Sequence, residues 1–232
     1  GLVKFIEAFK ADNILDFSKR SGVLILAALL ASGVSFTNLA TTMEYGKETI
    51  RGESELTAKS DNQTKGLDKD YITAWSYGIV ETFTLLIPNF YGGASQGELN
   101  TDSETYQAIK RAPNAKQLIK KLPIYWGTQP FTSGPTYAGS IVVFLFIFGL
   151  LFVKSEMRVW ILLATILSIM LAWGKNFMPL TDFFLNYFPA YNKFRSVSMI
   201  LIIAEFTLPL LGFVALNSFL NTDSEDKRKF LQ

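Results

Sequence analysis

The sequence predicts an all-α polytopic membrane protein, with about four transmembrane helices and with interfacial helices in a long extracytoplasmic loop. Its 232 residues are 49% hydrophobic and 14% aromatic, and the mean hydropathy is +0.24. The charged fraction of 18% is below the ~25% that is usual in soluble domains. Apolar residues also gather in separate runs, and about 20 helical residues cover the ~30 Å hydrocarbon core of a bilayer.

The composition excludes several classes of site. The chain has no Cys and no His, which removes thiol nucleophiles, disulfides, Ser-His-Asp triads and Cys/His zinc sites. Any metal would need oxygen ligands. The sequence therefore specifies no cofactor, and a divalent cation (Mg²⁺ or Mn²⁺) is the alternative. A net charge of +2 and the lack of a basic run with interleaved aromatics predict no nucleic-acid partner.

The first elements follow from helical spacing and charge. Residues 1–20 place Leu2, Phe5 and Phe9 at helical spacing between charged residues, which predicts a cytoplasmic amphipathic helix. Residues 21–40 form the first predicted span. Lys19 and Arg20 precede it, so the positive-inside rule places the N-terminus in the cytoplasm.

The chain is organised around residues 71–93, YITAWSYGIVETFTLLIPNFYGG, within a predicted extracytoplasmic loop that covers residues 41–136. The apolar core of this stretch is too short to span, because lengths of about 10–14 residues indicate re-entrant or interfacial helices. Pro88 ends the helical pattern. We therefore predict an interfacial helix over residues 71–87 on the outer membrane surface.

The remaining elements alternate across the membrane. The apolar runs and charged connections predict transmembrane helices at 137–153, 159–173 and 196–220, an extracytoplasmic loop at 174–195 and a cytoplasmic tail at 221–232. Lys175, Lys193 and Arg195 oppose this topology, because they lie in a short outer loop where the positive-inside rule disfavours cations. Either the predicted topology is wrong at this loop, or these cations have a function on the outer face.

Glu205 lies inside the last predicted span. A carboxylate at the centre of a membrane helix costs at least ~2.5–3.5 kcal/mol, so we expect it to face a bundle interior or a cavity. A structural hydrogen bond to a helix outside this sequence is the preferred interpretation, and a proton pathway is the alternative.

Five stretches together resemble the YfhO-type family of bacterial membrane proteins, in the version found in Bacteroidetes-like bacteria. They are RGESEL (51–56), AWSYGIVETFTLLIPNFYGG (74–93), YWGTQPFTSGPTYAGSI (125–141), WGKN (173–176) and YNKFRSVSMIL (191–201). The resemblance implies an internal fragment of a multi-pass protein of the bacterial inner membrane, whose further transmembrane helices belong to the same full-length protein.

The resemblance also implies a glycosyltransferase of the GT-C type. Such proteins transfer a sugar from a polyprenyl-phosphate donor to a cell-envelope acceptor, on the outer face of the bilayer. They place a catalytic acidic residue in the first outer loop, and nothing here matches that loop. We expect the catalytic acidic loop to lie outside this sequence.

A reaction of this type needs a carboxylate, cations and aromatic surfaces. The candidate carboxylates are Glu81 and Glu44, followed by Asp182; the alternative is an ion pair with a basic neighbour such as Arg51. The candidate ligands of the lipid phosphate are Lys175, Asn176, Lys193 and Arg195, and unspecific contact with headgroups is their alternative. The aromatics that could stack on a sugar or anchor the chain at the interface are Trp75, Tyr77, Tyr125 and Trp126.

Two other functions stay open. The chain could be an envelope lipid transporter or flippase, for which Glu205 would be the key residue. It could also be a non-catalytic integral membrane subunit. An ATP-driven pump is disfavoured, because the sequence lacks a G-x-x-x-x-G-K-[ST] motif.

Overall fold

A computed structural model describes residues 14–52 and 62–222. These residues form α-helices and 3₁₀-helices, and the only β-type pairing among them is two isolated bridges, so the predicted all-α class is confirmed. The chain divides into two compact units, residues 1–55 and 56–232. Most of the predicted helix 1–20, the motif residues 53–56 and most of the tail 221–232 lie outside the described ranges.

The first unit contains α2 (Ile14–Val34) and α3 (Phe36–Lys47). The two helices are bent by 72° at their junction, so the predicted span 21–40 is interrupted near its end. Hydroxyl side chains around the bend bond to main-chain carbonyls, as Ser32 does to Ala28 (2.9 Å) and Thr41 to Thr37 (2.8 Å). Such bonds compete with the helical pattern and favour bending.

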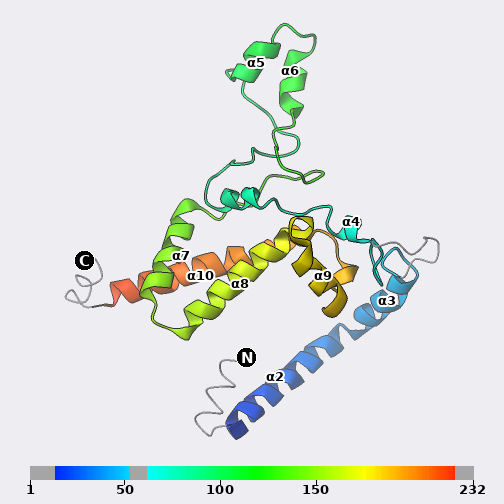
Figure 1. The fold of residues 1–232 in the computed structure, drawn as a ribbon, viewed down its shortest axis with the longest axis vertical. Helices are drawn as coiled ribbons and strands as arrows, with labels where there is room; N and C mark the ends of the chain where they lie inside the picture. Colours follow the sequence, from blue (N-terminus) through cyan, green and yellow to red (C-terminus); the bar gives the residue numbers. More distant parts are fainter. Residues whose placement is uncertain (1–13, 53–61, 223–232) are drawn as a thin grey trace. The chain divides into compact units, whose positions relative to one another are not determined.

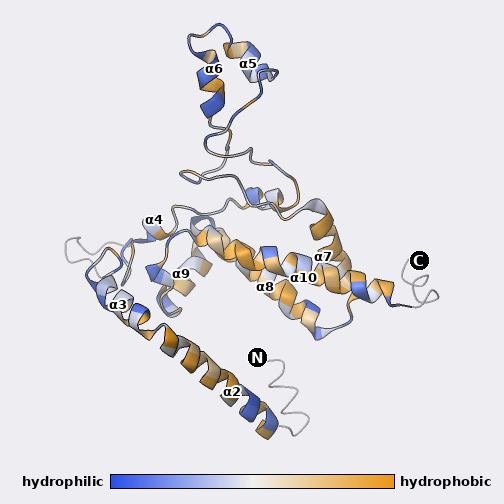
Figure 2. Ribbon diagram, turned by 180° about the vertical axis from the view of Figure 1, so that it is seen from behind, coloured by the Kyte–Doolittle hydropathy of each residue, from blue (hydrophilic) through white to orange (hydrophobic). Residues whose placement is uncertain are grey.

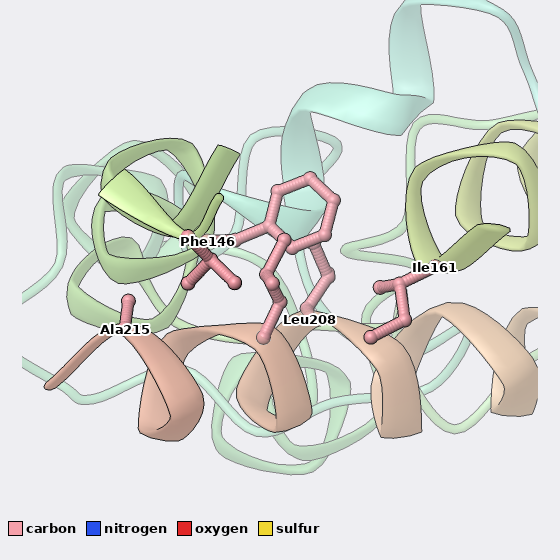
Figure 3. Close-up of a cluster of buried hydrophobic side chains, with 6 residues drawn as sticks. Phe146, Ile161, Leu208 and Ala215 are labelled. Atoms are coloured by element: carbon pink, nitrogen blue, oxygen red, sulfur yellow. The ribbon is translucent and has the colours of Figure 1, made fainter. Parts of the chain in front are cut away.

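Three apolar helices form the core of the second unit: α7 (Ser140–Phe152), α8 (Glu156–Ala172) and α10 (Leu201–Leu220). Figure 1 shows α10 in contact with both of the others. Phe146, Ile161, Leu208 and Ala215 meet in their shared core (Figure 3). Gly149 permits the close approach of α7 and α10, since an added Cβ would lie 2.7 Å from Cγ of Leu211.

The helix lengths support fewer spans than the sequence predicts. Within residues 14–52 and 62–222, one helix, Val197–Leu220, is long and apolar enough to cross a membrane, and the number rises to at most three if each bent pair is counted as one span. The bent pairs are α2 with α3, and α8 with the segment Gly174–Tyr187. The apolar helix α7 has 13 residues, which cover only about 20 Å. Figure 2 shows the apolar character of α2, α8 and α10.

The predicted interfacial helix over residues 71–87 is not continuous. The structure has a short helix α4 (Lys69–Ile72), an irregular turn, and the 3₁₀-helix η1 (Val80–Leu85). Thr73 and Ser76 end the first helix, because their hydroxyls bond to the carbonyls of Lys69 (2.8 Å) and Thr73 (2.6 Å). Side chains of the turn are then free for contacts with distant parts of the chain.

The other elements are short. Two isolated bridges, Gly92 to Tyr125 and Gly97 to Leu122, pair the two sides of the stem of an arm. This arm carries α5 (Glu104–Ile109), α6 (Ala115–Leu118) and η2 (Ile119–Lys121). The predicted loop 174–195 is largely helical, with η3 (Gly174–Phe177), α9 (Met178–Tyr187) and η4 (Tyr191–Lys193). A last 3₁₀-helix, η5 (Val197–Ile200), leads into α10.

Candidate functional site

The turn at residues 75–77 is joined to the end of α8 and the start of η3 by two hydrogen bonds. The amide of Tyr77 donates to the carbonyl of Ala172, and the amide of Lys175 donates to Oγ of Ser76, both at 2.8 Å. Gly174 has a φ of +46°, and a Cβ there would lie 2.2 Å from Oγ of Ser76. Only glycine fits this junction, which brings together two stretches separated by about a hundred residues. We call the region formed by residues 71–85, 125–131, 172–176 and 195 the cap.

Glu81 lies inside the cap and has no exposed surface. Its Oε2 accepts from the main-chain amide of Gly78 (2.9 Å), and its Oε1 accepts from the hydroxyl of Tyr125 (2.9 Å) and from side-chain Nε2 of Gln129 (3.5 Å). No Lys or Arg within residues 14–52 and 62–222 forms a salt bridge with it. The expected ion pair with a basic neighbour is therefore replaced by neutral donors, which satisfy the carboxylate without a counter-ion.

Two tyrosines next to Glu81 are held in their neutral form. Burial raises the pKa of Tyr77 to about 12, with a smaller contribution from the charges of Glu81 and Glu205. Burial and the hydrogen bond to Glu81 also raise the pKa of Tyr125 above its usual value. Tyr77 is only 1% exposed; its hydroxyl bonds to Thr84 and its ring packs on Leu201 and Ala204. It cannot stack on a sugar in this conformation, which corrects its role as a candidate surface aromatic.

The exposed part of the cap is a cluster of one cation and three aromatic rings. The guanidinium carbon of Arg195 lies 5.2 Å from the ring centre of Trp75 and 5.6 Å from that of Tyr71. Nη1 of Arg195 donates to the Tyr71 hydroxyl at 2.8 Å. Trp75 meets Phe131 edge-on at 5.2 Å and donates to its carbonyl at 3.0 Å. We call these four residues, Tyr71, Trp75, Phe131 and Arg195, the arginine cluster.

The position of the arginine cluster along the chain is informative. Arg195 lies two residues before the span-length helix Val197–Leu220. If this helix crosses a bilayer, Arg195 lies at the level of the headgroups, where aromatic and basic side chains are favoured. One of its five N–H groups is used on Tyr71, and the residue is exposed.

The other predicted phosphate ligands are brought together only in part. Lys175 is exposed, and its main-chain amide donates to Oγ of Ser76 at the cap junction. The side-chain Nδ2 of Asn176 donates to the carbonyl of Tyr77 (2.8 Å), and Nζ of Lys193 donates to the carbonyl of Lys65 (2.6 Å). These two donors are therefore used to hold the fold.

The remaining candidates are dispersed. Asp182 pairs with Lys69 at 2.7 Å, and Glu44 is exposed on α3 of the first unit. Trp126 is 80% exposed, as expected of a surface anchor or a stacking platform. Within the described part of the chain, no group of three or more acidic side chains that could hold a metal ion is found.

An apolar hollow of about 280 Å³ lies beside the cap. Its walls come from η1, α7 and α8, with Leu208 of α10, and they include Phe83, Phe146 and Ile166. At one edge, Oγ1 of Thr82 accepts from the indole N–H of Trp173 at 2.9 Å. The hollow therefore lies between the apolar helices α7, α8 and α10 and the polar cap.

Sequence reasoning missed several residues of this site. Tyr71 was missed, although it lies four residues before the candidate Trp75, a spacing that indicates neighbouring rings on a helix. Phe131, Thr84 and Gln129 had no such signal, because they meet the site through contacts over long sequence distances. Comparisons of the chain with protein-family models, curated proteins and solved structures find no match.

Proposed function

We propose that this chain is part of a multi-pass glycosyltransferase of the GT-C type in the bacterial inner membrane. It would transfer a sugar from a polyprenyl-phosphate donor to a cell-envelope acceptor. The observation that carries the proposal is the arginine cluster, which presents an exposed guanidinium two residues before a span-length helix. A phosphate on a hydrocarbon anchor lies at this same level.

The chemistry of the cluster suits a lipid phosphate. A guanidinium can donate two parallel hydrogen bonds to phosphate oxygens, and the rings of Tyr71 and Trp75 fix its orientation from one side. Near the bilayer the effective dielectric constant is lower than in water, so the attraction is stronger. Lys175, which follows the cap junction, would add a second point charge, and the apolar hollow beside Thr82 suits the first part of the hydrocarbon chain.

The fold itself supports the same proposal. Four of the five stretches that resemble YfhO-type proteins converge on the cap, through contacts of Trp75, Tyr125, Asn176 and Arg195. Glu81 binds Tyr125 and Gln129 inside the cap, so its role would be to position these loops rather than to deprotonate an acceptor.

A non-catalytic membrane subunit is the second candidate, and the complete burial of Glu81 favours it. A general base must reach the proton that it removes, and this carboxylate has no exposed surface. A lipid-binding subunit would keep the arginine cluster and leave the chemistry to another polypeptide.

The test compares wild-type protein in its native membrane with Arg195→Gln and Arg195→Lys. A photoreactive polyprenyl-phosphate sugar measures donor binding, and a radiolabelled donor measures transfer. We expect both variants to lose most of the labelling, because Lys cannot restore a bidentate contact. Arg158→Lys is the matched control, since Arg158 lies at the opposite end of α8 and donates to Leu150 (3.1 Å).

The outcomes separate the two candidates. Loss of binding together with loss of transfer supports the enzyme. Specific labelling of Arg195-containing protein without any transfer supports the subunit. Equal labelling of wild type and Arg195→Gln, at equal protein level, would rule out the arginine cluster as the phosphate site.

A further inference from the structure

Glu205 lies on the uncovered face of α10, away from the core. The buried face of this helix carries Ala204, Leu208 and Leu211, which pack toward α7 and α8. Glu205 is exposed, and so are its neighbours Ile202 (67%) and Phe206 (65%). No residue in the described ranges donates a hydrogen bond to the Glu205 carboxylate or forms a salt bridge with it.

The depth of Glu205 follows from two contacts of α8, one with Ile200 of η5 and one with Thr207 of α10. Oγ of Ser168 donates to the carbonyl of Ile200, and the hydroxyls of Thr165 and Thr207 bond to each other, both at 2.7 Å. Glu205 lies between these two levels. Trp173 marks the end of α8, about six or seven residues or roughly 10 Å further along the helix. If α10 spans the membrane, the carboxylate is therefore well inside the apolar layer.

A second acceptor lies at the same position. Pro209 is inside α10 and has no N–H, so the carbonyl of Glu205 lacks the donor that a helix normally supplies from four residues ahead. Residue 205 thus presents a carboxylate and a main-chain carbonyl on one exposed stretch of an apolar helix. Lipid tails offer no donor to either group, and polar groups at this depth need partners.

We infer that Glu205 is the docking point for a separate membrane-spanning helix that carries an arginine or lysine side chain. A basic residue matches both features, because it neutralises the carboxylate and has further N–H groups for the freed carbonyl. The exposed apolar side chains around Glu205, Ile202 and Phe206 among them, would pack against the rest of that helix. The inference goes beyond the proposed sugar transfer and holds equally for a lipid-binding subunit.

The test is site-specific photo-crosslinking in native membranes, with a photoreactive amino acid in place of Ile202. The matched control position is Phe144, which is equally exposed (65%) on α7. We expect a protein crosslink from position 202 and none with the same partner from position 144. Mass spectrometry should identify the crosslinked peptide as part of an apolar span that contains an Arg or Lys.

Substitutions then test the role of the carboxylate. Glu205→Ala and Glu205→Gln should lower the crosslink yield about tenfold, as expected for loss of a polar contact between membrane helices. Glu156→Ala, in the first turn of α8, should leave the yield unchanged. Exchanging the charges, with Glu205→Lys and the partner's basic residue changed to Glu, should restore it.

Several outcomes would overturn the inference. Crosslinks to lipid alone would mean that the face is lipid-exposed, and crosslinks to a second copy of this chain would mean self-association. A partner span without a basic residue, or a yield that Glu205→Ala does not change, would also contradict it. Because the wild-type crosslink is itself a readout, an unstable variant does not prevent a decision.

Discussion

Glu81 and Glu205 are carboxylates in two adjoining regions of the second unit, the cap and the exposed face of α10. Glu81 has no exposed surface and accepts hydrogen bonds from Gly78, Tyr125 and Gln129. Glu205 is exposed on an apolar helix and has no such donor among the residues that the structure describes. Both charges contribute to the raised pKa of Tyr77, which packs between the two regions.

This difference between the two carboxylates distinguishes a residue that stabilises the fold from one that is available to contact another molecule. A buried polar network that is fully satisfied makes a region rigid and specific, so the cap is a built support for the arginine cluster. A polar group on an otherwise apolar and uncovered face does not stabilise the fold through internal contacts. The four predictions below concern the unfolding free energy of the chain in mild detergent, followed by tryptophan fluorescence during denaturant titration.

Glu81→Ala should have the largest effect, a loss of about 3 kcal/mol. The change removes the acceptor that three donors share, and it takes the partner of the Tyr125 hydroxyl and of the Gly78 main-chain amide away in a partly buried place. Glu81→Gln keeps one acceptor oxygen and should lose about half as much. Unchanged stability in Glu81→Ala would show that the cap does not depend on this network.

Gly174→Ala should cost about 2 kcal/mol, because the new Cβ would lie 2.2 Å from Oγ of Ser76 and 2.6 Å from Cγ2 of Val197. The control is Gly33→Ala in α2, where nothing lies within 4 Å of the added Cβ. Alanine favours a helix over glycine by up to about 1 kcal/mol, so Gly33→Ala should be neutral or slightly stabilising. Equal losses in both variants would contradict a close-packed junction at residue 174.

Alkaline pH should weaken the cap through Tyr77. The pKa of Tyr77 is about 12 in the folded chain, above its ordinary value of 10.0, so the unfolded chain loses its proton first as pH rises. The contribution of Tyr77 to stability is therefore complete below pH 10 and decreases between pH 10 and 12. At pH 11 the loss is about 1.4 kcal/mol.

Tyr77→Phe should flatten this part of the pH profile. Tyr187→Phe is the control for loss of a hydroxyl, because Tyr187 is 76% exposed. A profile that is equally steep with and without Tyr77 would mean that other groups cause the alkaline loss.

The sequence was sufficient for the helical class and for the position of α10, because long apolar runs depend on composition alone. It was not sufficient for the cap. The apolar pattern over residues 71–87 predicts one helix, but Thr73 and Ser76 bond to preceding carbonyls and Tyr77 joins Ala172. The two hydroxyl bonds are local, and together with the long-range bond of Tyr77 to Ala172 they overcome the local helix propensity.

The candidate residues were predicted with mixed success for the same reason. A violation of the positive-inside rule singled out Arg195, but the contacts of its guanidinium with Tyr71 and Trp75 were not predicted. Glu81 was identified as unusual, but its partners Tyr125 and Gln129 lie more than 40 residues away in sequence. No local pattern predicts that a carboxylate will be closed off by donors from so distant a loop.

Glu205→Leu should have the smallest effect, within about 0.5 kcal/mol of the wild-type unfolding free energy. In detergent the isolated chain lacks the separate helix that we propose, so the carboxylate contributes no contact that the substitution could remove. The same change in native membranes should abolish the crosslink from position 202, so the two measurements together separate an internal role from an external one. A loss comparable with that of Glu81→Ala in detergent would show that Glu205 supports the fold of the chain itself, and the contrast between the two carboxylates would then fail.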